Sequence, residues 1–104
     1  MHPRVAGFDW DDANRDKCQK HGVSVAAIES MFHRPIAVLP DPVHSGDETR
    51  FKAIGKTDEG RRVLIVFTLR KRVGETFIRP ISARYMHVKE VKHYEKEAAK
   101  IEKR

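Results

Sequence analysis

The segment RVLIVFTL at residues 62–69 is the most apolar stretch of the chain and has the features of a buried β-strand. The run VLIVF within it has the length of a strand and falls far short of the roughly 18 residues that a membrane span needs. Apolar side chains in consecutive positions predict a strand that is covered on both faces. We therefore expect this segment to be the central strand of a sheet.

Further extended segments lie on both sides of it. The sequence predicts four strands, at residues 36–39, 49–56, 62–69 and 75–85, with a polar loop at 43–48. The turn sequences TDEG at 57–60 and RKRVG at 70–74 connect the last three strands. Pro80 cannot donate a ladder hydrogen bond, so it predicts an edge position or a β-bulge. Short turns between consecutive strands predict an antiparallel four-stranded sheet.

Helical patterns lie at the two ends of the chain. Asp9 or Asp11 can cap a helix from about Asp12 to His21, which Gly22 ends in a left-handed conformation. Ser24 can cap a second helix, Val25–Phe32.

A third helix is predicted at Val88–Arg104, where apolar residues recur at three- and four-residue steps. The sequence leaves open whether this helix packs on the same domain or on a partner. The expected architecture is α+β in the order α-α-β-β-β-β-α, one domain over residues 1–104 with helices packed against the sheet. The apolar entry at residues 8–10 can be a loop or an additional edge strand.

Charge is distributed unevenly along the chain. Residues 1–50 hold six Lys/Arg and eight Asp/Glu, whereas residues 51–104 hold fifteen and seven, so the net charges are −2 and +8. A basic surface of this kind attracts polyanions such as nucleic acids in a salt-dependent way. The alternative is a solvated surface that only keeps the protein soluble.

Cys18 is the only cysteine, so an internal disulfide is impossible and a reducing, cytoplasmic location is expected. Its place in a helical pattern favours a packed thiol over a nucleophile. The N-terminal MHPRV lacks the apolar segment of a signal peptide. The six histidines do not have the spacing of a ligand set, so neither a metal nor a cofactor is expected.

Several basic residues fall on or beside predicted strands. They are Arg50, Lys52, Arg70, Arg79 and Arg84. Ser82 and Arg84 share one face of the last strand, so neighbouring strands can form a basic surface that grips a phosphate. Alternatively, Arg50 and Arg84 form structural ion pairs with Asp47, Glu48 or Glu90. His21 at the end of the first helix is a candidate acid or base, or simply a capping residue.

Four motifs in this order resemble the BrnT family of bacterial type II toxin–antitoxin systems. They are FDWD at 8–11, KHGVS at 20–24, ETRFKAIG at 48–55, and ISAR at 81–84 followed by a helix with Glu90 and Tyr94. The resemblance extends over residues 8–95. Two positions differ from the family pattern, because many members carry Lys where Asn14 stands and an aliphatic residue where Pro80 stands.

The resemblance implies a RelE-like fold and a ribonuclease toxin that cleaves RNA without a metal and stops translation and growth. It also implies a cognate antitoxin that blocks the toxin and alone binds operator DNA. In this reading Arg50, Arg70 and Arg84 stabilise the phosphorane, Ser82 orients a phosphate oxygen, and His21 acts as acid or base. The remaining RNA-binding candidates are Lys17, Lys20, Lys52, Arg79 and Tyr85, of which Lys17 or Lys52 can replace His21. The alternative is a non-catalytic module that binds nucleic acid or the antitoxin.

Overall fold

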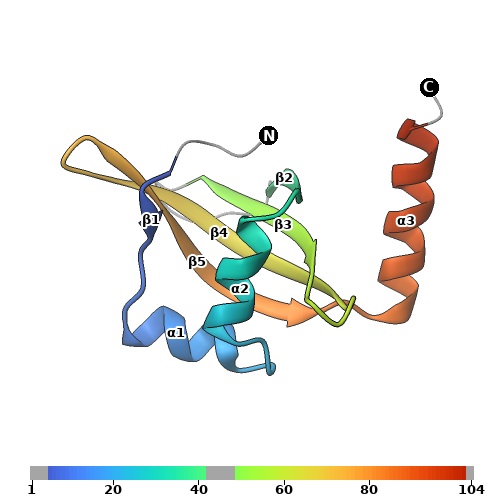
Figure 1. The fold of residues 1–104 in the computed structure, drawn as a ribbon, viewed down its shortest axis with the longest axis horizontal. Helices are drawn as coiled ribbons and strands as arrows, with labels where there is room; N and C mark the ends of the chain where they lie inside the picture. The colour runs from blue at the N-terminus through green and yellow to red at the C-terminus, as the bar shows by residue number, and fades with distance from the viewer. Residues whose placement is uncertain (1–4, 42–48, 103–104) are drawn as a thin grey trace.

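The structure is a computed structural model that describes residues 5–41 and 49–102, so the predicted loop at 43–48 lies outside the described residues. The elements in chain order are β1 (Gly7–Phe8), α1 (Asp12–Gln19), α2 (Val25–Phe32), β2 (Ala37–Asp41), β3 (Arg50–Lys56), β4 (Arg62–Arg72), β5 (Glu75–Tyr85) and α3 (Val88–Glu102) (Figure 1). The strands form one five-stranded sheet in the order β1-β5-β4-β3-β2. The class is therefore α+β, as predicted.

The prediction of four antiparallel strands was wrong in one respect. Strands β2 to β5 form the expected antiparallel meander, but β1 adds a fifth strand that runs parallel to β5. The backbone amides of Ala6 and Asp9 donate to the carbonyl oxygens of Thr76 and Ile78, both at 2.8 Å. A strand of two residues leaves no periodicity in the sequence, so only the partner strand defines it.

The central position of β4 is confirmed, but helices cover only one of its faces. Side chains at Val63, Ile65 and Phe67 are buried against α1 and α2. Leu64 and Val66, which alternate with them, are only half-buried. The expectation of cover on both faces was therefore wrong, because β4 is flanked by antiparallel strands and no crossover helix of residues 5–41 or 49–102 lies on its second face.

The ends of the predicted strands shift for local reasons. β4 continues to Arg72, and a two-residue turn follows, in which Val73 and Gly74 have φ of 51° and 79°. Two positive φ angles fit a type I′ turn, whose twist matches that of the hairpin strands. β2 continues through Pro40, because β2 is an edge strand and tolerates a missing donor.

Pro80 produces the predicted β-bulge but does not lie on an edge strand. Phe67 is paired with Pro80 and Val66 with Ser82, so Ile81 is an extra residue opposite β4. β5 lies between β4 and β1, yet β1 ends opposite Ile78. The carbonyl of Pro80 therefore has no strand partner on that side of β5.

The side chain of Asn14 fills this gap. Its amide nitrogen donates to the carbonyl oxygens of Pro80 (2.8 Å) and Asp9 (3.0 Å), and its oxygen accepts from the backbone amide of Asp11 (2.7 Å). Asn14 is 5% exposed, so these bonds satisfy a polar group in the interior. The two positions that differ from the family pattern are thus in direct contact.

The helices begin where the sequence predicts. Asp11 caps α1 and Ser24 caps α2, and Gly22 has the expected positive φ of 89°. α1 ends at Gln19, so His21 lies in the following turn rather than in the helix. Figure 1 shows α1 and α2 against the sheet, whereas α3 stands apart beyond the end of β5. No helix in residues 5–41 or 49–102 is both long and apolar enough to cross a membrane.

Replacing Asn14 by Ala should lower the free energy of unfolding by about 1–3 kcal/mol, because the Pro80 carbonyl and the Asp11 amide lose their buried partner. Urea unfolding followed by circular dichroism measures this change. Asp16→Ala on the exposed side of α1 is the matched control and should have a much smaller effect. Equal losses in the two variants would show that the Asn14 contact contributes nothing specific.

Candidate functional site

The face of β3, β4 and β5 opposite α1 and α2, called here the outer face, carries the predicted strand cations. Cross-strand pairing forms three rows on it: Lys52–Val66–Ser82, Ile54–Leu64–Arg84, and Thr68–Arg79. Neighbouring strands lie about 4.8 Å apart, so the Cα atoms of Lys52 and Ser82 are separated by about 10 Å. A phosphate with its sugar can span this distance.

The bulge decides which residues of β5 share the outer face. Side chains alternate along a strand, so residues three apart, such as Arg79 and Ser82, normally point to opposite faces. The extra residue Ile81 removes this mismatch, and both pair with outward-facing residues of β4. Pro80 therefore brings Arg79 onto the same face as Ser82 and Arg84.

Arg84 forms a bidentate ion pair with Glu90 of α3. Its two terminal nitrogens each lie 2.8 Å from a different carboxylate oxygen, so the predicted structural pair is confirmed. This bond, followed by the backbone amide of His87, lowers the pKa of Glu90 from 4.5 to about 2. The same pair raises the pKa of Arg84. The other proposed partners, Asp47 and Glu48, lie outside the described residues.

Arg79 holds the start of α1 against β5. Its guanidinium lies 2.9 Å from Asp11 and 3.7 Å from Asp9, and Arg72 also contacts Asp9 at 3.1 Å. The Asn14 backbone amide and then Arg79 lower the pKa of Asp11, the residue that caps α1. Arg79 is therefore a structural residue as well as a cation of the outer face.

The remaining outer-face candidates differ in their surroundings. Lys52 and Ser82 are half-buried and pair with Val66 from opposite sides. Arg50 and Arg70 each already have an interaction partner within the protein. Thr68, opposite Arg79, has a hydroxyl that is the one buried side-chain polar atom without a hydrogen-bond partner in the described part of the chain.

The structure places the other predicted residues on the helix-covered side. Tyr85 pairs with Val63, whose side chain lies in the core, so its ring is on the face opposite Arg84. Arg61 covers that ring at 3.6 Å, and Gly22 approaches it from the α1–α2 turn. Exposed Lys17, Lys20 and His21 belong to this helical side and are not brought together with Ser82.

From the sequence, Glu90 was predicted as an ion-pair partner and as part of the fourth motif, and no role was predicted for His87. The backbone amide of His87 donates to Glu90 at 2.9 Å, and Val91 donates to the His87 carbonyl at 3.0 Å. A Glu three residues after a helix cap is the second half of a capping box, so the spacing H-x-x-E could have revealed this anchor.

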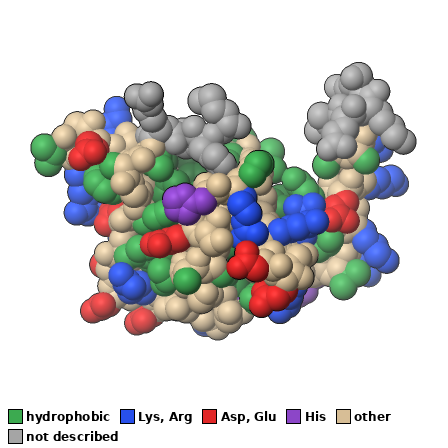
Figure 2. Space-filling model, in the orientation of Figure 1, with side chains coloured by type: hydrophobic (Ala, Val, Ile, Leu, Met, Phe, Trp, Pro, Cys, Tyr) green, Lys and Arg blue, Asp and Glu red, His purple; other side chains and the backbone are tan. Residues whose placement is uncertain are grey.

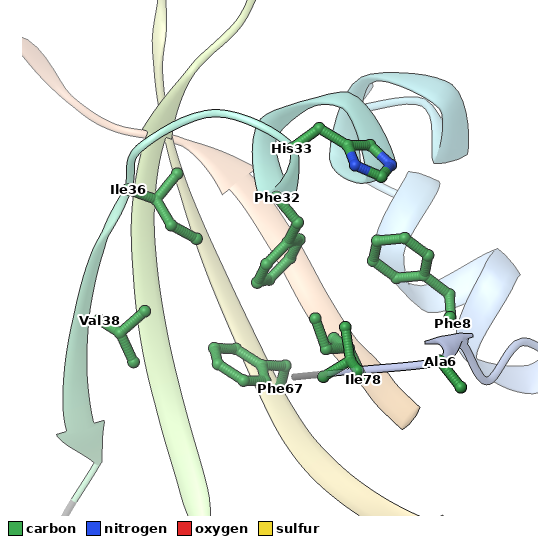
Figure 3. A pocket seen from close by; sticks show the side chains of 10 residues that line it. Ala6, Phe8, Phe32, His33, Ile36, Val38, Phe67 and Ile78 are labelled. Carbon is green, nitrogen blue, oxygen red and sulfur yellow. The ribbon is translucent and has the colours of Figure 1, made fainter. Parts of the chain in front are cut away.

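The apolar pocket in Figure 3 is a poor candidate for phosphate chemistry. Its volume is about 430 Å³, and Phe8, Phe32, Phe67 and Ile78 line it. His33 is the only titratable residue among its described lining. The pocket is therefore suited to apolar contacts.

Cys18 and Trp10 are part of the packed core region. Cys18 is fully buried, so the expected packed thiol is confirmed, and burial raises the pKa of this thiol to about 11. Trp10 packs against the core and donates from its indole nitrogen to Glu29 at 2.8 Å. Within residues 5–41 and 49–102, no cluster of three or more His, Cys, Asp or Glu could hold a metal ion.

The sequence matches one family model over residues 10–90, described as the ribonuclease toxin, BrnT, of the type II toxin–antitoxin system. The matched segment begins just before the α1 cap Asp11 and ends at Glu90, the partner of Arg84. It contains β3, β4 and β5 and therefore all three rows of the outer face. No curated protein matches the chain.

Replacing Glu90 by Gln should lower the melting temperature at pH 7, because Arg84 loses its charged partner. The folded-state pKa of Glu90 is depressed, so its contribution to stability is present above about pH 4.5 and is lost as the pH falls towards 2. The difference in melting temperature between the wild type and E90Q should therefore shrink over this range.

E97Q is the matched control, since Glu97 forms an exposed pair on the same helix. It should change the melting temperature little at any pH. A wild type to E90Q difference that is the same at pH 7 and pH 2.5 would contradict the assigned role of the carboxylate.

Proposed function

The chain belongs to the BrnT family of ribonuclease toxins of type II toxin–antitoxin systems, and we propose that it cleaves RNA at the outer face of its sheet without a metal ion. The observation that carries this proposal is the placement of Lys52, Ser82 and Arg84 in adjacent rows of a face that no described helix covers. These groups are cations and a hydroxyl, which bind phosphate oxygens.

Cleavage by the neighbouring 2′-hydroxyl requires three operations. The hydroxyl loses its proton, the phosphorane gains negative charge, and the 5′-oxygen is protonated as it leaves. The outer face supports the second operation best. Lys52 and Arg84 neutralise the phosphorane charge, and Ser82 donates a hydrogen bond that orients one of its oxygens.

Arg84 can do this without releasing Glu90. The carboxylate occupies the two terminal nitrogens, so the edge formed by Nε and one terminal nitrogen is directed elsewhere. A guanidinium can hold a carboxylate and a phosphate on different edges. Glu90 then fixes the plane of Arg84 and prepares it for the phosphate.

Proton transfer needs groups next to Arg84. Glu90 and His87 lie there, at the start of α3, and an imidazole can both donate and accept a proton. While Arg84 holds it, Glu90 is too weak a base for efficient proton removal, because its pKa is about 2. His87 is therefore the better candidate for the proton-transfer group, and Lys52 is the second. The acid or base role of His21 remains a prediction from the sequence.

Membership of a type II family implies an antitoxin protein as partner and RNA as target. We extend the proposal to neutralisation of the toxin by its cognate antitoxin, which would contact operator DNA. The second candidate function, a non-catalytic binding module, is favoured by the carboxylates that already occupy Arg79 and Arg84.

Replacing Lys52 by Gln, or Ser82 by Ala, should slow the cleavage of total RNA in EDTA, because a preorganised charge or a hydrogen-bond donor is lost. For K52Q the rate should fall on the order of 100-fold. Gel analysis of the purified variants measures the rate, and circular dichroism checks their folding. Lys71→Gln is the matched control, since Lys71 lies near the β4–β5 turn and pairs with Thr76 rather than with an outer-face residue.

Normal rates in K52Q and S82A would place the active site elsewhere. RNA binding by the wild type without any cleavage product would favour the binding module. Loss of activity in K71Q as well would indicate a general effect of net charge.

Expression of this chain alone in a bacterium should arrest growth, because RNA is degraded while no antitoxin is present. K52Q should relieve the arrest, and co-expression of the cognate antitoxin should restore the growth of cells that express the wild-type chain. Growth curves with immunoblots of soluble protein measure both effects. Undiminished growth at confirmed soluble expression would contradict an active toxin.

A further inference from the structure

A cleft of about 470 Å³ lies between the start of α3 and the turn that joins β3 to β4. The charged residues that line it are Lys56, Arg61 and Arg62 on the sheet side and Lys92 and Glu95 on α3. Figure 2 shows Lys and Arg side chains gathered where α3 meets the body of the molecule. None of these residues belongs to the outer-face rows described above.

Two contacts hold α3 in place as one wall of this cleft. Arg84 binds Glu90 at the base of the helix, and Arg62 donates to Glu95 at 3.3 Å about one turn further on. The guanidinium of Arg62 also lies 5.1 Å from the centre of the Tyr94 ring. The cleft is therefore built by specific contacts on both of its sides.

The cleft has an excess of positive charge that the described residues of the protein do not neutralise. Glu95, the one carboxylate among the described lining residues, is already paired with Arg62. Lys56 and Lys92 are exposed on the two facing walls, and neither forms an ion pair with a described residue. Two lysines that line the same cleft favour an anionic ligand.

The cleft continues the outer face. Arg62 pairs with Lys56 and lies two residues before Leu64, which pairs with Arg84. Two residues along a strand span about 7 Å, so the cleft opens one row beyond the proposed site of cleavage. A ligand bound at Arg84 that extends in this direction enters the cleft.

We propose that this cleft binds the sugar–phosphate backbone of the RNA that flanks the cleaved bond. The proposal rests on the proposed function, since it gives the same substrate a second contact. Arg61 and Arg62 already cover the Tyr85 and Tyr94 rings, so the described cleft offers a base little aromatic surface. Its contact with RNA is therefore electrostatic and independent of sequence.

The structure separates Lys92 from the other lysines of α3, because Lys92 lines the cleft while Lys89 and Lys96 do not. This difference provides a matched control on the same helix.

The test compares K56Q/K92Q with K89Q/K96Q, two double variants of equal charge. The ligand is a 16-nucleotide RNA with 2′-O-methyl groups, which prevent cleavage. Its affinity for the full chain is measured by fluorescence anisotropy between 50 and 200 mM salt. K56Q/K92Q should bind several-fold more weakly at 100 mM salt, and its slope of log affinity against log salt should be smaller by about 1.4. K89Q/K96Q should stay close to the wild type.

Cleavage kinetics give the second readout. With a cleavable 16-mer, K56Q/K92Q should raise KM far more than it lowers kcat. The resulting loss of kcat/KM should be larger than the loss with a pool of trinucleotides, which are too short to fill the cleft. Equal losses with both substrate lengths would overturn the proposal.

The binding experiment remains decisive if the wild type cleaves nothing, which would refute the proposed function alone. Equally weakened RNA binding in the two double variants would show an effect of net charge only and would overturn the proposed role of the cleft. Unchanged RNA binding together with weakened antitoxin binding in K56Q/K92Q would also overturn it and assign the cleft to the antitoxin.

Discussion

The β-bulge at Ile81 is the constraint on which the arrangement of this protein depends. Side chains alternate strictly along a strand, so one extra residue in β5 exchanges the faces of everything that follows it. The bulge lets Ala83 continue the core while Arg79, Ser82 and Arg84 all face outward. It also leaves the Pro80 carbonyl without a strand partner, and Asn14 of α1 supplies one. The sheet, the first helix and the basic face are thus coupled through one irregularity.

The cations discussed above form two groups with different roles. Arg62, Arg79 and Arg84 are paired with carboxylates and fix α3 and the start of α1 against the sheet. Lys52, Lys56 and Lys92 form no ion pair with a described residue. Arginine suits the first group because its planar fork holds a carboxylate in a defined direction. The ammonium groups are left available for an anion, and they extend from the outer face into the cleft beside α3.

Prediction from sequence succeeded where the signal was local. Positions Asp11, Ser24 and Gly22 carry their own capping chemistry, so the ends of α1 and α2 were largely foreseen. The apolar run 63–67 similarly identified the central strand, and Pro80 indicated the bulge. The β1 strand was foreseen only as an alternative for the apolar entry at residues 8–10, and the extension of β2 through Pro40 was missed. Short or edge strands are defined by their partner rather than by their own residues.

The sequence by itself determined the types of element, the α+β class, the family resemblance and the presence of cations on strands. Each of these depends on residues close together in the chain, where spacing and side-chain chemistry are directly visible. Only the tertiary structure decided which cations meet. It placed Tyr85 on the face opposite Arg84, fixed Arg84 to Glu90, and brought Lys92 of α3 opposite Lys56 of β3. These outcomes depend on strand register and on the direction in which α3 leaves β5, which are set by contacts between distant residues.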